Sequence, residues 1–343
     1  MLKFFSPLLL LFLVNCEKQT TFIDAKLLNG EPLKEVSVLS GGNVSLVVVD
    51  TFLVIQKNEE KFISIYSTKN HELLASVGKE GRGPKEFLGP ELIKQIGYDE
   101  VNNSPLVYVY DYKRKNISTI NVIEAIEEGE ITLQESLPSQ SNYLPYFFYK
   151  GEDFYLASPA SGAGRFLIYD YDTSEITITP YIPKLDVAIP KTELSSVYRS
   201  TAYVNTEKKL IASATLHIGQ LDFFDLDGNY IRSTVFDPLG SSAEELKLPS
   251  SSWKETRYYI EEIESKNNKI YALNFNNKVL NFNNENRPNN VKIQVFDWLG
   301  KPLKEYELNE RLINAFAVDP IHNRIYAYSP NEEKYNIIIY SID

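Results

Sequence analysis

The sequence is poor in the residues that most often carry chemistry. Its 343 residues include one cysteine, one methionine and three histidines. A single cysteine excludes an internal disulfide. The histidines, His71, His217 and His322, lie in or beside turn-like stretches, where a hydrogen-bonded structural role is expected more often than acid–base catalysis. Because His-Glu-x-x-His and Gly-x-Ser-x-Gly motifs are also missing, the sequence indicates no catalytic residue.

Positive charge is also in short supply. The formal net charge is −11, which argues against binding to nucleic acid and against a polybasic membrane surface. The composition is otherwise that of a folded chain, with 43% apolar and 24% charged residues. Aromatic residues are abundant, with 23 Tyr and 18 Phe, and this bias favours strands over helices.

The first sixteen residues, MLKFFSPLLLLFLVNC, have the layout of an export signal. The apolar run from Phe4 to Val14 is too short to span a bilayer but has the length of a signal-peptide core. Leu13-Val14-Asn15-Cys16 resembles a bacterial lipobox, so we predict that residues 1–15 are removed and that Cys16 carries the lipid. Because no Asp follows Cys16, the outer membrane is the expected location. An ordinary secretory signal with an incidental cysteine is the alternative.

The remainder of the chain repeats. Six short apolar stretches, each following turn residues, recur at intervals of 48 to 60 residues. Their first large apolar residues are Phe52, Leu106, Phe154, Leu210, Ile270 and Ile325. A second series follows at nearly the same period, with aligned positions at Tyr66, Asn121, Tyr169, Phe224, Phe296 and Tyr340. Asp-Gly and related turns then lead into a third strand, and a weaker strand precedes each first-series stretch.

Four antiparallel strands repeated six times predict a six-bladed β-propeller over residues 16–343, a single all-β domain. A β-sandwich array is the rival, but no linker appears at its period. The last unit ends after its second-series stretch and lacks an outer strand, and an open ring would leave an unpaired edge. We therefore predict that an N-terminal segment, either 21–28 or 34–40, completes the last blade and closes the ring.

The stretch GKEGRGPKEF, residues 78–87, has the glycine content of a phosphate loop but the wrong order of residues, and no helix follows it. Its position predicts a connection between the first two blades. Gly78, Gly81 and Gly83 would permit positive φ there, and Pro84 would fix the exit. A ligand or partner role for Arg82 at the channel mouth is a further hypothesis.

A glycine-rich G-x-x-G-x-G-P-x-E-F stretch behind a lipoprotein signal resembles the TolB-like six-bladed propeller lipoproteins of Gram-negative bacteria. The matching residues are Gly78, Gly81, Gly83, Pro84, Glu86 and Phe87. Lys85 stands where a glycine is expected. The resemblance implies the propeller architecture and an envelope location, and it implies no biochemical activity.

Calcium in the central channel is the alternative cofactor hypothesis, because some six-bladed propellers that resemble gluconolactonases hold one, and hard cations prefer oxygen ligands. Candidate carboxylates are Asp50, Asp111, Asp170, Asp225 and Asp297. Several of these lead into hairpins, where an aspartate usually bonds its own turn. We therefore expect no cofactor, with a divalent-cation-dependent hydrolase or lactonase as the alternative function.

Three insertions lengthen the loops at residues 184–198, 238–257 and 276–290, and loops on rigid scaffolds often carry recognition. The candidate contact residues within them are Trp253, Phe282 and Arg287. The sequence thus predicts a lipid-anchored envelope propeller that binds or scaffolds an unknown protein or carbohydrate. An accessory role in nutrient uptake or sensing would be one form of this function.

Overall fold

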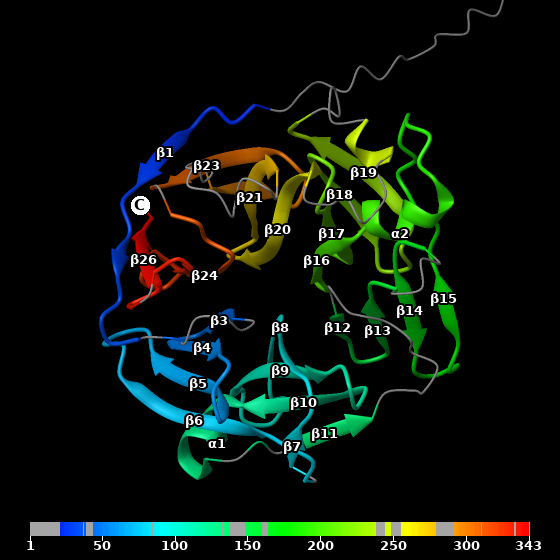
Figure 1. Cartoon of the computed structure of the whole chain (residues 1–343). Helices are drawn as coiled ribbons and strands as arrows, with labels where there is room; N and C mark the ends of the chain where they lie inside the picture. Colours follow the sequence, from blue (N-terminus) through cyan, green and yellow to red (C-terminus); the bar gives the residue numbers. More distant parts are fainter. Residues whose placement is uncertain are drawn as a thin grey trace, which may run out of the picture.

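The strands form six small sheets arranged in a ring (Figure 1). The computed structural model describes residues 21–343 except 37, 39–43, 84, 130, 132, 137–147, 160–163, 238–243, 248–254, 279–290, 310, 333 and 343. The predicted six-bladed propeller is confirmed. Each blade is an antiparallel meander whose first strand lies nearest the axis of the ring (Figure 1).

The blades follow one another in chain order. Blade 1 contains β3 (Ser45–Val49), β4 (Phe52–Gln56), β5 (Lys61–Ser67) and β6 (Leu73–Glu80). Blade 2 contains β8 (Pro90–Tyr98), β9 (Pro105–Asp111), β10 (Asn116–Asn121) and β11 (Leu133–Ser136). Blade 3 contains β12 (Phe148–Lys150), β13 (Phe154–Ala157), β14 (Leu167–Asp170) and β15 (Ile176–Ile178).

The second half of the ring repeats this plan. Blade 4 contains β16 (Ser200–Asn205), β17 (Leu210–Thr215), β18 (Gln220–Asp225) and β19 (Tyr230–Val235). Blade 5 contains β20 (Arg257–Lys266), β21 (Lys269–Lys278), β22 (Lys292–Asp297) and β23 (Pro302–Leu308). Blade 6 contains β24 (Ala315–Asp319), β25 (Arg324–Tyr328) and β26 (Ile337–Ser341).

Helical structure in the described residues is confined to short connections. The helix α1 (Val122–Glu128) follows β10, with the Asn121 side chain accepting hydrogen bonds from two backbone amides at its start and Gly129 in the left-handed region at its end. The other helical elements are η1 (Lys191–Glu193), α2 (Leu194–Val197) and η3 (Glu245–Lys247). In the described part of the chain, no helix is both long and apolar enough to cross a membrane.

An N-terminal segment closes the ring, as predicted, although the pairing residues differ from both proposed stretches. The strand β2 (Glu31–Pro32) pairs antiparallel with β26 and gives blade 6 its fourth strand. The strand β1 (Ala25–Leu28) instead pairs parallel with β23, on the outer edge of blade 5. Further along, the side chain of Asn336 holds both the N–H and the C=O of Val38. The segment therefore crosses two blades before it enters blade 1 (Figure 1).

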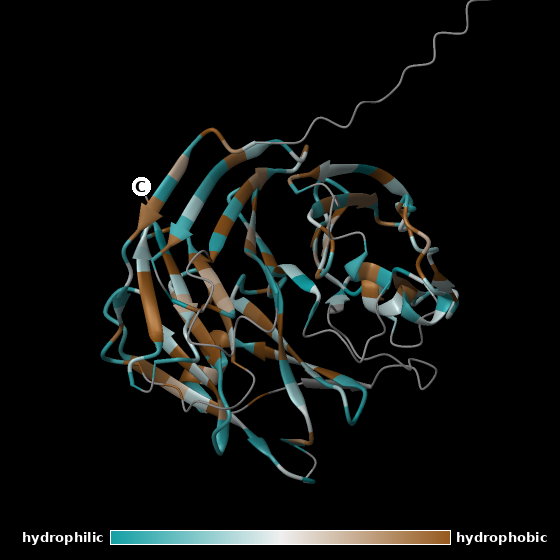
Figure 2. Cartoon of the chain, turned by 45° about the horizontal axis from the view of Figure 1, so that its top comes forward, coloured by the Kyte–Doolittle hydropathy of each residue, from teal (hydrophilic) through white to brown (hydrophobic). Residues whose placement is uncertain are grey.

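The apolar core lies between blades rather than within one sheet, because each sheet has two faces to cover. Apolar residues alternate with polar ones along many strands (Figure 2). Six clusters of buried residues each join two neighbouring blades, including blade 6 and blade 1, and so run around the whole ring. Leu33, Val36 and Val38 belong to the cluster between blades 6 and 1, so the N-terminal segment also fills the closing interface.

Candidate functional site

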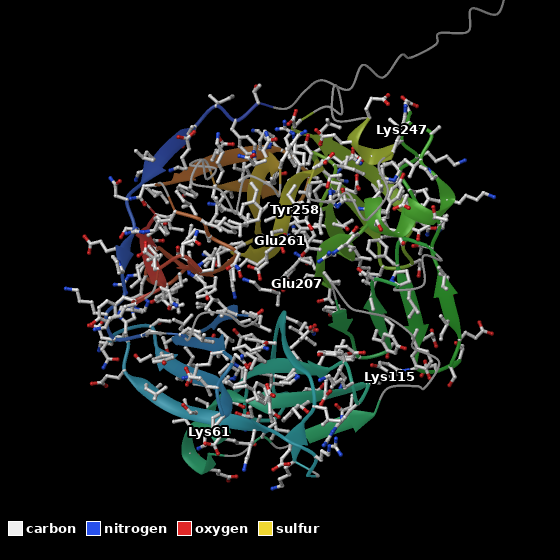
Figure 3. The ribbon with its side chains drawn as sticks, viewed as in Figure 1. Lys61, Lys115, Glu207, Lys247, Tyr258 and Glu261 are labelled. Carbon is white, nitrogen blue, oxygen red and sulfur yellow. The ribbon has the colours of Figure 1, made fainter. Side chains whose placement is uncertain are left out.

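A cavity of about 1190 Å³ occupies the centre of the ring, and it is the candidate functional site. Inner strands of five blades contribute to its wall, namely β8, β12, β16, β20 and β24, together with residues at the start of β3. Its size is that of a site for a small molecule or a short chain segment. In Figure 3, Glu207 and Glu261 lie near the axis of the ring, whereas Lys61, Lys115 and Lys247 lie toward its periphery.

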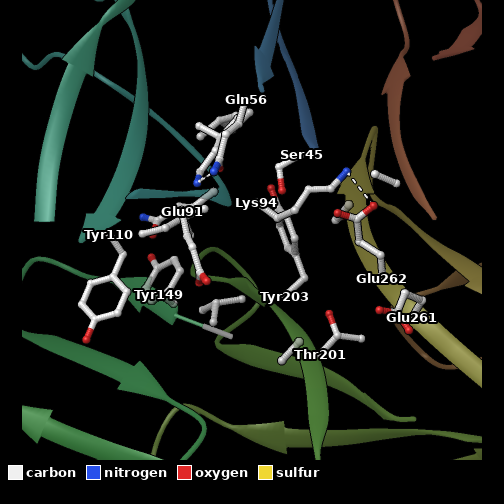
Figure 4. A pocket seen from close by; sticks show the side chains of 18 of the residues that line it. Ser45, Gln56, Glu91, Lys94, Tyr110, Tyr149, Thr201, Tyr203, Glu261 and Glu262 are labelled. Atoms are coloured by element: carbon white, nitrogen blue, oxygen red, sulfur yellow. Dashed lines mark hydrogen bonds and ion pairs between the residues drawn. The ribbon is translucent and has the colours of Figure 1, made fainter. Parts of the chain in front are cut away.

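One wall of the cavity carries an ion-pair cluster formed by three blades. The ammonium group of Lys94, on β8, lies 2.9 Å from a Glu264 carboxylate oxygen and 3.4 Å from one of Glu262, both on β20. The same ammonium group donates to the carbonyl oxygen of Phe316 on β24 and lies over the Phe316 ring. Lys94 therefore reaches across the channel from blade 2 and ties together the inner strands of blades 5 and 6 (Figure 4).

The two glutamates of this cluster also accept hydrogen bonds from the backbone of β24. Glu262 accepts a hydrogen bond from the Phe316 amide at 3.0 Å, and Glu264 accepts one from the Val318 amide at 2.5 Å. Burial is the main cause that raises the pKa of Glu262 to about 7, and Lys94 and the Phe316 amide oppose this shift. The Glu262 carboxyl group therefore holds its proton to a higher pH than an exposed glutamate does.

Glutamine side chains join the inner strands of neighbouring blades elsewhere in the ring. Gln56 of blade 1 donates to the carbonyl oxygen of Pro90 at 2.8 Å and accepts from the amide of Leu92, both on β8. Gln95 of blade 2 makes the same pair of bonds with the backbone of Lys150 on β12. These contacts fix the positions of the strands that carry the cavity residues.

Tyrosines form much of the remaining wall. Tyr110, Tyr112, Tyr149 and Tyr203 line the cavity and come from blades 2, 3 and 4. Burial raises the pKa of Tyr110 and of Tyr149 to about 12, and it raises the pKa of Tyr203 still further. All three remain neutral phenols at physiological pH. Tyr149 and Tyr203 are partly exposed and offer uncharged rings and hydroxyl groups, whereas Tyr110 is almost fully buried in the core between blades 2 and 3.

Two carboxylates of the cavity lie apart from the Lys94 cluster. Glu91 is partly buried on β8, and its side chain makes no hydrogen bond or ion pair with another residue in the described ranges. In Figure 4, Glu91 and Lys94 point toward different sides of the cavity. Glu261 lies opposite on β20, and burial raises its pKa although the positive charge of Arg199 acts in the other direction.

The glycine-rich loop lies at the outer edge of blade 1. It connects β6 to β7 (Glu86–Phe87), a short strand that pairs parallel with the end of β6. This arrangement agrees with the predicted blade-to-blade connection. Arg82 is exposed on the loop and is not among the residues that line the central cavity, so the structure does not place it at the channel mouth. Its proposed role in binding stays a prediction.

The glycines of the loop are required for different reasons. Only Gly78 has a positive φ, 73°, and its hydrogen atom faces the Phe62 ring, where a Cβ atom would lie 2.5 Å away. At Gly81 a Cβ atom would lie 2.1 Å from Oε2 of Glu86, and the amide of Gly83 donates to that same oxygen. The expected positive φ at Gly81 and Gly83 is therefore wrong, because close approach of Glu86 explains these residues.

The other predicted site residues fall into two groups. Phe87 is buried in the core between blades 1 and 2, where its ring packs edge-on against Phe62, and this supports its structural role. The remaining residues lie outside the described part of the chain: Cys16, Pro84, Trp253, Phe282 and Arg287.

The five candidate calcium ligands do not converge on one site. Carboxylate oxygens of Asp111, Asp170, Asp225 and Asp297 accept hydrogen bonds from backbone amides of their own turns. Asp50 accepts from the hydroxyl group of Tyr98. Turn formation accounts for the first four, as the sequence indicated for Asp170, Asp225 and Asp297, and this arrangement does not fit a shared calcium site. Within the described ranges, no group of three or more His, Cys, Asp or Glu residues could hold a metal ion.

The histidines lie outside the cavity wall. His71 contacts the hydroxyl group of Tyr326, and His322 pairs with Asp319 at 2.8 Å. His217 contacts the carbonyl oxygen of Arg257, and burial lowers its pKa to about 4. These contacts agree with the structural roles expected from the sequence.

The comparison with protein families decides the classification. The family model described as TolB-like 6-blade propeller-like matches residues 44–320. The chain belongs to the TolB-like six-bladed propeller family. The matched region of this TolB-like propeller begins just before β3 and therefore does not include the closing strands β1 and β2.

Solved structures share the fold of this TolB-like propeller at low sequence identity. A member of the DUF4221 family from Bacteroides vulgatus ATCC 8482 superposes with a TM-score of 0.58 at 12% identity, over 95% of this chain and 98% of the other. A protein from Bacteroides fragilis NCTC 9343, named as exported, gives a TM-score of 0.55 at 14% identity, over 94% and 97% of the two chains. No curated protein sequence matches the chain.

The residues that line the cavity were not found from the sequence. Two signals were present in the inner strands. In PELIKQIGY, Glu91, Lys94 and Gln95 interrupt an apolar strand, and in YYIEEIESK three glutamates do the same. Charged residues in the innermost strand of a propeller blade face the channel or a neighbouring blade, so this pattern indicates the residues that line the cavity.

Proposed function

We propose that this TolB-like propeller is a binding module of the cell envelope that holds its ligand in the central cavity. The observation that carries the proposal is the cavity of about 1190 Å³, lined by neutral tyrosines and by carboxylates on rigid inner strands. Such a combination of ring faces with a few fixed polar groups is typical of ligand sites. The expected ligand is a small molecule or a short segment of a protein or carbohydrate.

The envelope location rests on the first sixteen residues and on the similar structures. The lipobox-like ending at Cys16 supports a lipid anchor, and a structural neighbour is named as an exported protein. The absence of Asp after the cysteine favours the outer membrane. An accessory role in nutrient uptake or sensing is compatible with such a location.

Two experiments test the proposal. Fractionation of cells that express the full chain should place it in the membrane. The purified protein should carry the added mass of a lipid, and Cys16→Ser should abolish both the membrane location and the added mass. For the cavity, Thr201→Trp should fill space between the inner strands and weaken binding of any ligand found by screening oligosaccharides and peptides. Thr173→Trp, on an exposed turn of blade 3, is the matched control. Binding that Thr201→Trp leaves unchanged would exclude the cavity as the site.

A hydrolytic activity is the second candidate, and Glu262 favours it. A carboxyl group with a pKa near 7 can both accept and donate a proton at neutral pH, as general acid–base catalysis requires. Turnover of lactone or ester substrates that Glu262→Gln abolishes would support this function. Metal analysis of the purified protein would then decide whether a divalent cation takes part.

A further inference from the structure

We propose that the ligand of the central cavity is a cation, a molecule that bears an ammonium or guanidinium group and is held by Glu91 among the tyrosines. This inference rests on the proposed binding function and adds the chemical class of the ligand. Its basis is the juxtaposition of an unpaired carboxylate, aromatic ring faces and an excess of acidic groups in one cavity.

The charge of the cavity wall is the first argument. Four glutamates line it, against two cationic side chains, Lys94 and Arg199. Lys94 is already engaged by Glu262 and Glu264, so it offers no free positive charge to an anionic ligand. Arg199 acts electrostatically on Glu261 and lowers the pKa of that carboxyl group against the effect of burial. The two remaining wall carboxylates, Glu91 and Glu207, favour a cation.

The position of Glu91 is the second argument. A partly buried carboxylate without a partner in the described ranges is costly, because it has lost water without gaining a compensating charge. Burial accordingly raises its pKa. A bound ammonium group would supply the missing hydrogen-bond donors and the opposite charge.

The aromatic residues are the third argument. Tyr149 is partly exposed and lies on the same side of the cavity as Glu91 (Figure 4), whereas Tyr110 is only 1% exposed and packs in the core between blades 2 and 3. The faces of aromatic rings attract cations, and carboxylates combined with such rings form the usual sites for organic ammonium groups. An anionic ligand would be repelled by the same wall, and a neutral sugar would leave Glu91 unpaired.

Titration calorimetry on the purified full chain tests the proposal with four named probes. Spermidine and trilysine are the cationic probes, triglutamate is the anionic one and maltotriose is the neutral one. We expect the two cationic probes to bind the wild-type protein. Glu91→Gln should raise their Kd about ten- to a hundred-fold, the loss expected for one charge-assisted hydrogen bond.

Two controls separate the cavity from the general negative charge of the protein. Glu80→Gln removes one exposed carboxylate at the outer edge of blade 1 and should leave Kd unchanged. Tyr149→Phe should retain binding, and Tyr149→Leu should weaken it, because only the latter removes the ring. Thermal melts of each variant check that it is folded. If Glu91→Gln does not fold, the comparison of Tyr149→Phe with Tyr149→Leu tests whether the cationic probes bind beside this ring.

The outcomes distinguish this inference from the proposed function. If maltotriose or triglutamate binds and Thr201→Trp abolishes the binding while the cationic probes fail, the cavity is a ligand site but the inference about cations is wrong. If the cationic probes bind equally well to wild type and Glu91→Gln, the inference is also overturned. If no probe binds, the inference falls, and the ligand screen with Thr201→Trp still decides the proposed function.

Discussion

Lys94 shows how much a single side chain contributes to this ring. Its ammonium group contacts two carboxylates of β20 and a carbonyl oxygen of β24, although it comes from β8 on another blade. The group is 14% exposed, so its charge is only partly screened by water. The cluster therefore holds the inner strands at a fixed spacing and thereby shapes the cavity wall.

The raised pKa of Glu262 predicts how stability depends on pH. The folded protein binds this proton more tightly than the unfolded chain does, because burial raises the pKa of Glu262 from its ordinary value of 4.5 to about 7. The resulting stabilisation is fully present below about pH 4.5 and is lost as the pH rises through 7. Glu262→Gln should remove this dependence, which is worth about 3 kcal/mol over the full pH range.

Thermal melts between pH 5 and pH 8 measure this effect as the difference between wild type and Glu262→Gln. The comparison with the variant is needed because burial lowers the pKa of His217, so that this residue makes stability increase with pH where Glu262 makes it decrease. Lys94 and Glu264 lie beside the same carboxyl group and are present in both proteins. Glu175→Gln, at an exposed turn, is the control and should follow wild type. If the melting temperatures of wild type and Glu262→Gln changed with pH in the same way, the raised pKa of Glu262 would be contradicted.

A buried ion pair gives a second prediction. Arg165 and Asp222 lie 2.7 Å apart, and both side chains are fully buried. Arg165→Met would leave the Asp222 carboxyl group buried without its partner, at a cost of about 3–5 kcal/mol in the free energy of unfolding. Denaturant unfolding measures the loss. The double variant Arg165→Met/Asp222→Leu should recover much of it, and a double variant as unstable as the single one would refute this explanation.

Among the elements, the N-terminal segment is held by a buried side chain as well as by its short ladders. Asn336 is fully buried and forms two hydrogen bonds with the backbone of Val38, at 3.0 and 2.6 Å. Asn336→Ala would leave both backbone groups buried without partners, so we expect a loss of about 1–3 kcal/mol. Hydrogen exchange of the Val38 amide should accelerate.

The matched control for this prediction is Asn70→Ala, at an exposed turn, where the loss should be a few tenths of a kcal/mol. Unchanged protection of the Val38 amide in Asn336→Ala would show that the segment is held by its apolar contacts alone.

The strands of the blades could be predicted because their signals are local. Apolar stretches bounded by turns indicated which strands pair within a blade. Gly228 and Gly300 adopt the positive φ that their hairpins require. The strands β1, β2 and β7 were harder, since two of them are only two residues long and β1 and β7 pair in parallel. Their pairing depends on contacts with distant residues, which no local pattern records.

At the scale of the whole molecule, the closing segment should determine both stability and association. A variant that begins at residue 44 lacks β1 and β2 and exposes the core between blades 6 and 1, including the surface that Leu33 and Val36 cover. We expect a lower melting temperature than for a variant that begins at residue 21, together with dimers or larger species, because β26 would become an open edge.

Size-exclusion chromatography and thermal melts of the two variants measure these effects. If the two variants had equal melting temperatures and both eluted as monomers, the ring would close without the N-terminal segment.

The ring itself could be predicted from the sequence, whereas the cavity residues could not. A repeat of nearly constant period specifies the number of blades, because each copy must bury the faces of its neighbours. The cavity is different, since Glu91, Tyr149, Tyr203 and Glu261 come from four blades and share no motif. Only closure of the ring brings them together, so their relation is absent from any short stretch of sequence.

The parallel pairing of β1 with β23 has a mechanical consequence. A tension applied along the chain at its N-terminal end meets the four residue pairs of this ladder together, in shear, and does not peel them apart one at a time. The seam formed by β2 and β26 lies behind that ladder and is shielded from the load. A pull on the N-terminal end would therefore load the β1–β23 ladder first and leave the β2–β26 pairing that closes the ring intact.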